Sequence, residues 1–167
     1  MRRGGIHLFL VIKNKIKTRS QIVRLVRQLK KRKKRIVFTN GCFDILHSGH
    51  VYYLEHAKRL GDCLVVGLNS DRSVQRIKGK GRPINFERDR ACVLSALASV
   101  DFVCVFNEET PLDLIKLIKP DALVKGSDWK TAQITGAKEV LSWGGKVKRV
   151  TLLKGRSTTA TIEKLKK

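Results

Sequence analysis

The chain has 167 residues, of which 42% are hydrophobic, so it can bury a core but has no room for a second domain. Lysine and arginine number 36 against 14 aspartates and glutamates, which gives a formal net charge of +22. This charge favours a polyanionic partner, whether nucleic acid, a membrane surface or a phosphorylated small molecule, although a solvated basic surface would explain it equally well.

Cysteine usage and hydropathy argue against a disulfide scaffold and against a transmembrane protein. The four cysteines form no C-x-x-C pair. The apolar run of residues 6–12 is too short to span a bilayer, and lysines follow it instead of a small-residue cleavage site. We therefore expect a cytoplasmic protein with no membrane partner.

The N-terminal part of the chain is strongly basic. Residues 1–17 are predicted to be a basic extension, and residues 18–167 are predicted to form a single domain. The domain opens with an amphipathic helix at about 18–33, in which apolar side chains recur at helical spacing opposite arginines and lysines. Thr18 or Ser20 could cap this helix.

The segment I-V-F-T-N-G-C-F-D-I-L-H-S-G-H, at residues 36–50, predicts a buried strand, a turn at Asn40-Gly41 and then a helix. His47 and His50 bracket the start of that helix, where free backbone N–H groups and the helix dipole favour anions. We therefore predict a phosphate site here. No metal site is expected, because zinc needs three or four ligands and the two remaining histidines are poorly placed.

Strands and helices then alternate along the chain. Apolar runs predict four further strands, at residues 63–68, 102–106, 122–124 and 146–152. Helices are predicted at residues 73–77, 86–97 and 111–118, in a segment that ends near 143, and from about 158. This alternation predicts a doubly wound α/β domain with a parallel five-stranded sheet, a Rossmann-like fold that binds ligands at the carboxyl ends of its strands.

Three other stretches follow predicted strands and should meet residues 36–50 at that edge of the sheet. They are residues 69–71 with the basic, glycine-rich loop that comes next, residues 125–129, and residues 155–159. Each carries donors or cations that a triphosphate would need. The last of them, G-R-S-T-T, could hold phosphates or be an ordinary helix cap.

These motifs resemble a known family. H-S-G-H at residues 47–50 resembles the H-x-G-H signature of the nucleotidylyltransferase superfamily, and T-N-G-C-F-D-I-L in front of it is similar to the cytidylyltransferase-like branch. The resemblance runs from about Gln21 to Lys164 and includes L-N-S-D-R-S-V, K-G-K-G-R-P-I-N, I-K-P-D-A-L-V-K-G-S-D-W and G-R-S-T-T. It is strongest to the adenylyltransferase domain of bacterial ADP-heptose synthase, a D-glycero-β-D-manno-heptose 1-phosphate adenylyltransferase.

The resemblance implies a reaction. AMP would pass from ATP to the heptose 1-phosphate, giving ADP-heptose and pyrophosphate for the inner core of lipopolysaccharide. The acceptor phosphate would attack the α-phosphorus in line, without a covalent enzyme intermediate. Mg²⁺ would accompany ATP as the cofactor, and a separate heptose kinase would supply the sugar phosphate. A homodimer is one option for assembly.

The resemblance also assigns roles to single residues. The catalytic residues it implies are His47, His50 and Lys78. The nucleotide-binding residues it implies are Cys42, Phe43, His47, His50, Gly126, Gly155, Ser157, Thr158 and Thr159. The residues it implies for the acceptor substrate are Asp44, Lys78 and Arg90. The sequence departs from the family pattern at Trp129, where tyrosine is common, and at Arg156, where a small residue is expected.

Each acceptor residue has an ordinary alternative. Lys78 could be a solvated loop lysine, and Asp44 could cap the turn that contains it. Arg90 could pair with Glu87 or Asp101 instead of binding a ligand.

Two other functions stay open. Within the superfamily, the protein could be a cytidylyltransferase that acts on glycerol 3-phosphate or another sugar phosphate. From a different class, it could be a basic nucleic-acid-binding protein, although no recognition motif or aromatic reading surface supports this.

Overall fold

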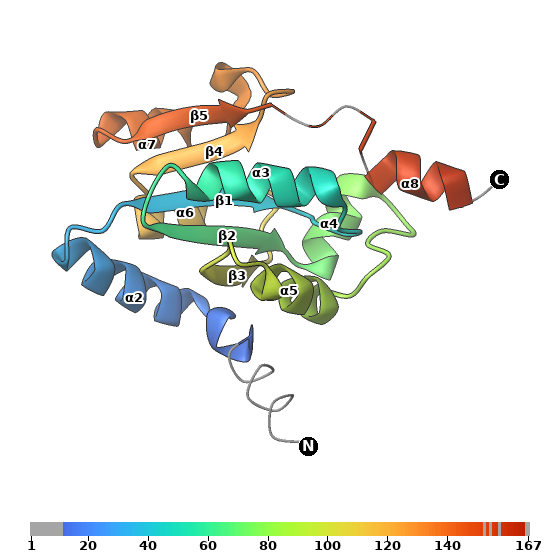
Figure 1. Ribbon diagram of the computed structural model, residues 1–167, viewed down its shortest axis with the longest axis horizontal. Helices are drawn as coiled ribbons and strands as arrows, with labels where there is room; N and C mark the ends of the chain where they lie inside the picture. Colours follow the sequence, from blue (N-terminus) through green and yellow to red (C-terminus); the bar gives the residue numbers. More distant parts are fainter. Residues whose placement is uncertain (1–11, 152, 154, 157, 166–167) are drawn as a thin grey trace.

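A computed structural model of the protein describes residues 12–151, 153, 155–156 and 158–165. Five parallel strands form one sheet in the order β3-β2-β1-β4-β5 (Figure 1). They are β1 (Ile36–Gly41), β2 (Cys63–Asn69), β3 (Phe102–Phe106), β4 (Ala122–Gly126) and β5 (Lys146–Val150). The order reverses between β1 and β4, so this is the doubly wound α/β fold predicted from the sequence, with its switch point between those two strands.

Helices cover both faces of the sheet (Figure 1). The labelled helices are α2 (Arg19–Lys31), α3 (Ser48–Lys58), α4 (Asp71–Lys78), α5 (Glu87–Ala96), α6 (Leu112–Ile118), the 3₁₀ turn η1 (Thr131–Gln133), α7 (Ala137–Ser142) and α8 (Thr158–Leu165), and of these α2, α6 and α7 lie on one face and α3 and α5 on the other. None of the described helices is both long and apolar enough to cross a membrane.

Two hydrophobic cores lie on opposite faces of the sheet because successive strand side chains point to opposite faces. Ile36 and Phe38 of β1 belong to the core that α2, α6 and α7 close. Val37, between them, belongs to the core that α3 and α5 close. The strands therefore read as continuous apolar runs, as buried parallel strands do.

The predicted N-terminal helix is confirmed, and it begins at a complete cap. Thr18 accepts a hydrogen bond from the backbone N–H of Gln21, and the Gln21 side chain accepts one from the backbone of Thr18. This reciprocal pair satisfies two backbone N–H groups that a helix start leaves free. Ile22 and Val26 then anchor α2 in the core.

The described end of the predicted extension packs on the sheet. Ile16 forms a parallel bridge with Val103 of β3, and the backbone N–H of Lys17 donates to the Val103 carbonyl at 2.8 Å. The Lys15 ammonium donates to the carbonyls of Leu97 and Val100. Residues 16 and 17 thus cover part of the outer edge of β3, while residues 1–11 lie outside the described part.

The opposite edge of the sheet is protected by charge. β5 has the sequence K-V-K-R-V, and Lys146, Lys148 and Arg149 are exposed along it. Charged side chains on an edge strand oppose pairing with another chain.

Candidate active site

A cavity of about 460 Å³ opens at the carboxyl ends of β1 and β4, at the switch point of the sheet. Four chain segments far apart in sequence form its wall. The lining residues are Asn40, Gly41, Cys42, Phe43, His47, Gly49, His50, Tyr53, Lys78, Lys125, Gly126, Asp128, Trp129, Leu153, Arg156 and Thr158. The cavity therefore gathers most of the stretches that the sequence places after strands.

The two signature histidines lie side by side in this wall. His47 precedes α3 and His50 lies in its first turn, and their rings are stacked with centroids 3.9 Å apart. The Phe43 ring meets His50 edge-on at 5.3 Å. The Nδ1 atoms of both histidines are buried and, among the described residues, have no hydrogen-bond partner. Buried polar atoms are normally paired, so these two indicate a ligand or water in the cavity.

Both imidazoles are uncharged at neutral pH. Burial and the neighbouring His47 ring lower the pKa of His50 to about 4. Burial and the positive charge of Arg156 lower the pKa of His47. A neutral imidazole donates from one nitrogen and accepts at the other, so the pair offers directed hydrogen bonds without charge. The positive charge of the cavity wall comes instead from Lys78, Lys125 and Arg156.

Gly49, between the histidines, is required by close packing. A Cβ atom at this position would lie 3.0 Å from the His47 ring and 3.2 Å from Cβ of Arg156. Both contacts are tighter than most Cβ contacts in proteins. The glycine thus allows the His47 ring and the segment before α8 to approach the start of α3.

The Asp44 carboxylate is buried and faces away from the cavity, toward the loop that follows α4. It accepts hydrogen bonds from the backbone N–H groups of Ile84 and Asn85 and from Nε of Arg82, at 2.7–2.9 Å. Burial opposes its ionisation, but these hydrogen bonds outweigh burial and hold the pKa of Asp44 below its usual value. Asp44 therefore ties the glycine-rich loop to the turn before α3. The backbone N–H groups that its carboxylate accepts from lie in that loop and not in its own turn.

Arg90 is also buried and engages three protein acceptors. Its guanidinium donates to the carboxylate of Asp71 at 2.7 Å, to the carbonyl of Asn85 at 2.9 Å and to the carbonyl of Cys42. The alternative partners considered from the sequence, Glu87 and Asp101, are wrong, because the folded loop brings Asp71 closer. Arg90 thus joins the turn after β1, the start of α4 and the loop before α5.

The other predicted residues divide into three groups. Cys42, Phe43, Lys78, Gly126 and Thr158 line the cavity with the two histidines. Asp44 and Arg90 instead border a neighbouring hollow of about 120 Å³, which shares Phe43 with the cavity. Gly155 is described but is not part of the cavity wall, Ser157 lies outside the described residues, and only the backbone of Thr159, at the start of α8, is described.

The sequence assigned no individual role to several cavity residues, although most of them lie in the stretches that it predicted to meet at this edge of the sheet. They are Asn40, Lys125, Asp128, Trp129, Leu153 and Arg156. Asn40 and Lys125 come together because β1 and β4 are neighbours in register, with Val37 beside Ala122. The signal that could have found them is the switch point itself, since the ends of the two strands that flank it form the ligand crevice.

The wall holds few candidate metal ligands. Within the described part of the chain, no group of three or more histidine, cysteine, aspartate or glutamate side chains could hold a metal ion. Asp128 is the one carboxylate among the described residues that line the cavity. A metal ion here would therefore take most of its ligands from a bound phosphate compound.

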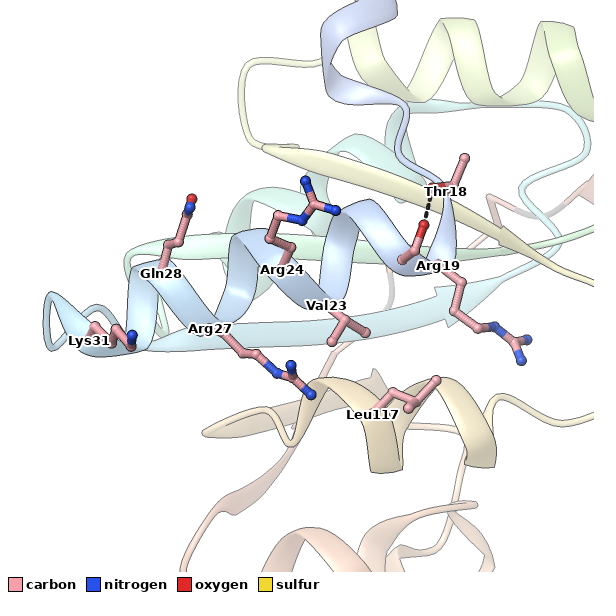
Figure 2. A pocket seen from close by; sticks show the side chains of 9 residues that line it. Thr18, Arg19, Val23, Arg24, Arg27, Gln28, Lys31 and Leu117 are labelled. Carbon is pink, nitrogen blue, oxygen red and sulfur yellow. Dashed lines mark hydrogen bonds between the residues drawn. The ribbon is translucent and has the colours of Figure 1, made fainter.

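A second hollow, of about 930 Å³, lies on the outer side of α2 and shares no residue with the first (Figure 2). Arg24, Arg27 and Lys31 project from α2 around it, and Leu117 of α6 forms part of its floor. Among the described residues these three cations make no ion pair. The surface is basic and shallow, with none of the convergent groups of the first cavity.

Comparison with known proteins agrees with the geometry. The family model described as cytidylyltransferase-like matches residues 38–162. The bifunctional protein HldE of Wolinella succinogenes is 53% identical over 151 residues, which cover 90% of this chain and 31% of that protein. HldE of Methylobacillus flagellatus is 58% identical over 132 residues, 79% of this chain and 27% of that protein. The chain thus spans about a third of the length of these relatives.

A solved structure shares the fold. The lipopolysaccharide core biosynthesis protein from Thermoplasma volcanium GSS1 superimposes with a TM-score of 0.60 at 34% sequence identity. The match covers 74% of this chain and 99% of that one.

Proposed function

The chain belongs to the cytidylyltransferase-like family of nucleotidyltransferases, and on that premise we propose that it transfers AMP from ATP to D-glycero-β-D-manno-heptose 1-phosphate. The products are ADP-heptose, for the inner core of lipopolysaccharide, and pyrophosphate. The observation that carries this proposal is the identity of about half of all aligned residues to proteins named HldE, over most of this chain. The similarity to a Thermoplasma protein of lipopolysaccharide core biosynthesis supports the same pathway.

The proposed reaction needs a site that positions two phosphate compounds and stabilises charge. An oxygen of the acceptor phosphate attacks the α-phosphorus in line, and pyrophosphate leaves. His47 and His50 donate hydrogen bonds to the nucleotide phosphates from uncharged rings, and Lys78 offsets the repulsion between the two anions. Cys42, Phe43 and Gly126 border the nucleotide, and Gly155, Ser157, Thr158 and Thr159 hold its outer phosphates at the start of α8.

Asp44 and Arg90 act in this proposal by positioning other groups. Both side chains are buried and hydrogen-bonded to protein atoms, so neither has a free group to offer in the arrangement described. Asp44 holds the loop that carries Arg82, and Arg90 holds the turn that carries Cys42. Together they would hold this loop and this turn in place beside the acceptor substrate.

The cofactor and partners are part of the same proposal. Mg²⁺ would neutralise charge on the triphosphate, with Asp128 as the carboxylate that the described part of the wall could offer it. A heptose kinase, on the same or a separate chain, would supply the acceptor, and the reaction would take place in the cytoplasm. A homodimer is compatible with the proposal and is not required by it.

Pyrophosphate release tests the proposal. The protein is offered ATP or CTP with Mg²⁺, each with the heptose 1-phosphate or with glycerol 3-phosphate. Release only with ATP and the heptose phosphate is the expected result. Release only with CTP would favour the cytidylyltransferase alternative, and no release in any combination would contradict nucleotidyl transfer.

A further inference from the structure

Lys125 lies at the switch point of the sheet, one residue before the end of β4. The parallel register of β1 and β4, with Val37 beside Ala122 and Phe38 beside Leu123, brings it next to Asn40 when continued along the strands. Its ammonium donates to the Asn40 carbonyl at 3.3 Å and lies 5.6 Å from the centre of the Trp129 ring. The side chain therefore bridges the two strand ends that form the floor of the cavity.

This ammonium has no counter-ion within the described residues. Its one hydrogen bond to that part of the chain is the one to the neutral carbonyl of Asn40. The two charged side chains that are fully buried in the described part of the chain are paired, Arg90 with Asp71 and Asp44 with Arg82. Lys125 is half-buried and lines the cavity without an ion pair to any described residue, so an anion bound in the cavity would supply the partner it lacks.

The pKa of Lys125 reflects the same lack of an ion pair. Burial lowers the pKa of Lys125 to about 8, although the negative charge that Cys42 can carry and that of Asp128 act in the opposite direction. At neutral pH the side chain is mostly charged, and above pH 8 it is mostly neutral. An anion close to the ammonium would restore its charge.

The surrounding groups define which anion fits. The titratable and charged groups that line the cavity with Lys125 are Cys42 beside β1, His47 before α3, His50 and Tyr53 on α3, Lys78 on α4, Asp128 after β4 and Arg156 before α8. The histidines are neutral donors whose Nδ1 atoms have no partner among the described residues, and Lys78 and Arg156 are cations beside Lys125. Such a set suits a phosphoryl group, which accepts several hydrogen bonds and carries the missing negative charge.

We infer that Lys125 is a catalytic residue of the proposed nucleotidyl transfer, whose ammonium binds a phosphoryl oxygen of the nucleotide. The inference rests on the proposed function for the identity of the nucleotide. It goes beyond the roles of His47 and His50, because it assigns a positive charge that meets the phosphate to a side chain at the end of β4. Without nucleotide, the Lys125 side chain contacts Asn40 and Trp129, and the bound phosphate replaces these contacts.

Nucleotide binding without acceptor tests the inference. Isothermal titration of the full chain with ATP and Mg²⁺, at pH 7, 8 and 9 and in buffers of different ionisation enthalpy, reports both affinity and proton uptake. One coupled proton weakens binding by about tenfold per pH unit above the pKa of the free lysine. With a free-lysine pKa of about 8, the wild-type protein should therefore bind about fivefold more weakly at pH 9 than at pH 8 and should take up close to one proton at pH 9.

Variants separate a chemical role from a structural one. Lys125→Met should weaken binding at pH 7 by about 10- to 100-fold and remove proton uptake at pH 9, and Lys125→Arg should keep binding at pH 9. Cys42→Ser, which removes the thiol from the cavity wall, should keep the pH dependence. The matched control is Lys116→Met on the exposed face of α6, which should bind like the wild type.

Two results would overturn the inference. One is a folded Lys125→Met protein whose affinity and proton uptake equal those of the wild type. The other, decisive even if Lys125→Met fails to fold, is a Lys125→Arg protein that loses affinity between pH 8 and pH 9 as the wild type does. If the expected binding results are obtained but no acceptor is adenylylated, the proposed function fails and the assignment of Lys125 as a nucleotide ligand stands.

Discussion

The imidazole rings of His47 and His50 are stacked at 3.9 Å, and the second is uncharged down to about pH 4 because it is buried and has the first as its neighbour. In the unfolded chain a histidine titrates near pH 6.5. Between these two pH values the unfolded chain binds a proton that the folded protein does not.

Stability should therefore fall as the pH is lowered from 6.5 toward 4, and His50 should account for about 2 kcal/mol of the loss at pH 5. Urea denaturation at pH 7 and pH 5 measures the difference, with His50→Gln as the variant. The loss between the two pH values should be about 2 kcal/mol smaller in His50→Gln than in the wild type. His56→Gln, in the same helix, is the control. Equal losses in His50→Gln and the wild type would contradict the depressed pKa.

Substitution of the phosphate-binding groups should remove turnover without unfolding the protein. His50→Ala deletes a donor to the phosphates and Lys78→Ala deletes a charge, so we expect kcat to fall by about 10²- to 10³-fold in each. Pyrophosphate release measures kcat, and circular dichroism checks the fold. Lys80→Ala is the matched control, because Lys80 is exposed just beyond the end of α4 and does not line the cavity. Wild-type rates in His50→Ala and Lys78→Ala would refute the site assignment.

Arg90 should be irreplaceable by lysine. A guanidinium spans the three acceptors of Asp71, Asn85 and Cys42, whereas an ammonium cannot satisfy them from one position. Arg90→Lys should lower the free energy of unfolding by about 2–3 kcal/mol and reduce kcat, because it loosens the turn beside the histidines.

Arg88→Lys serves as the control for that experiment, because Arg88 lies exposed on the same helix. Chemical denaturation and steady-state kinetics should show Arg88→Lys unchanged. If Arg90→Lys were as stable and active as the wild type, the hydrogen bonds of Arg90 would not be needed to hold the site.

The glycine of the signature should be needed for geometry and not for stability. In Gly49→Ala the new methyl group would meet the His47 ring at about 3.0 Å, so the ring must move. We expect kcat to drop by about tenfold or more, because small misplacements are costly in catalysis. Thermal unfolding should change little, since alanine in a helix gains up to about 1 kcal/mol over glycine and offsets part of the strain.

Ser48→Ala provides the comparison for Gly49→Ala. Ser48 is the exposed residue between His47 and Gly49, and its loss should leave kcat unchanged. A fully active Gly49→Ala protein would show that the close approach to His47 has no catalytic consequence.

The basic surface of α2 should not contribute to turnover. Replacement of Arg24, Arg27 and Lys31 by glutamine removes three cations from the second hollow (Figure 2) and should leave pyrophosphate release unchanged. Binding to duplex DNA, measured by fluorescence anisotropy across a salt series, should be weak and without sequence preference in the wild type. Tight binding that the triple variant loses would favour the nucleic-acid alternative.

Most of the fold could be predicted because buried parallel strands are short, continuous apolar runs. The strand at 102–106 has the predicted bounds, and the helix of α4 starts two residues earlier than predicted because Ser70 caps it and Asp71 joins its first turn. The 3₁₀ turn η1 was not predicted, since a single turn leaves no periodic pattern.

The site could be predicted only in part. The histidine signature is local in sequence, so a motif reveals it. The meeting of Asn40 with Lys125 depends on which strands are neighbours, and the inward direction of Asp44 and Arg90 depends on how the loop after α4 folds back. Hydrophobic periodicity predicts neither property, because both arise from contacts between segments about 40 to 85 residues apart in the chain.

The two edges of the sheet limit how copies of this chain can associate. Residues 16 and 17 occupy part of the free side of β3, and cations line β5. Growth of the sheet across a molecular boundary, strand against strand, is thus opposed at both ends. Association through helices or loops is therefore favoured over continuation of the sheet from one subunit into the next.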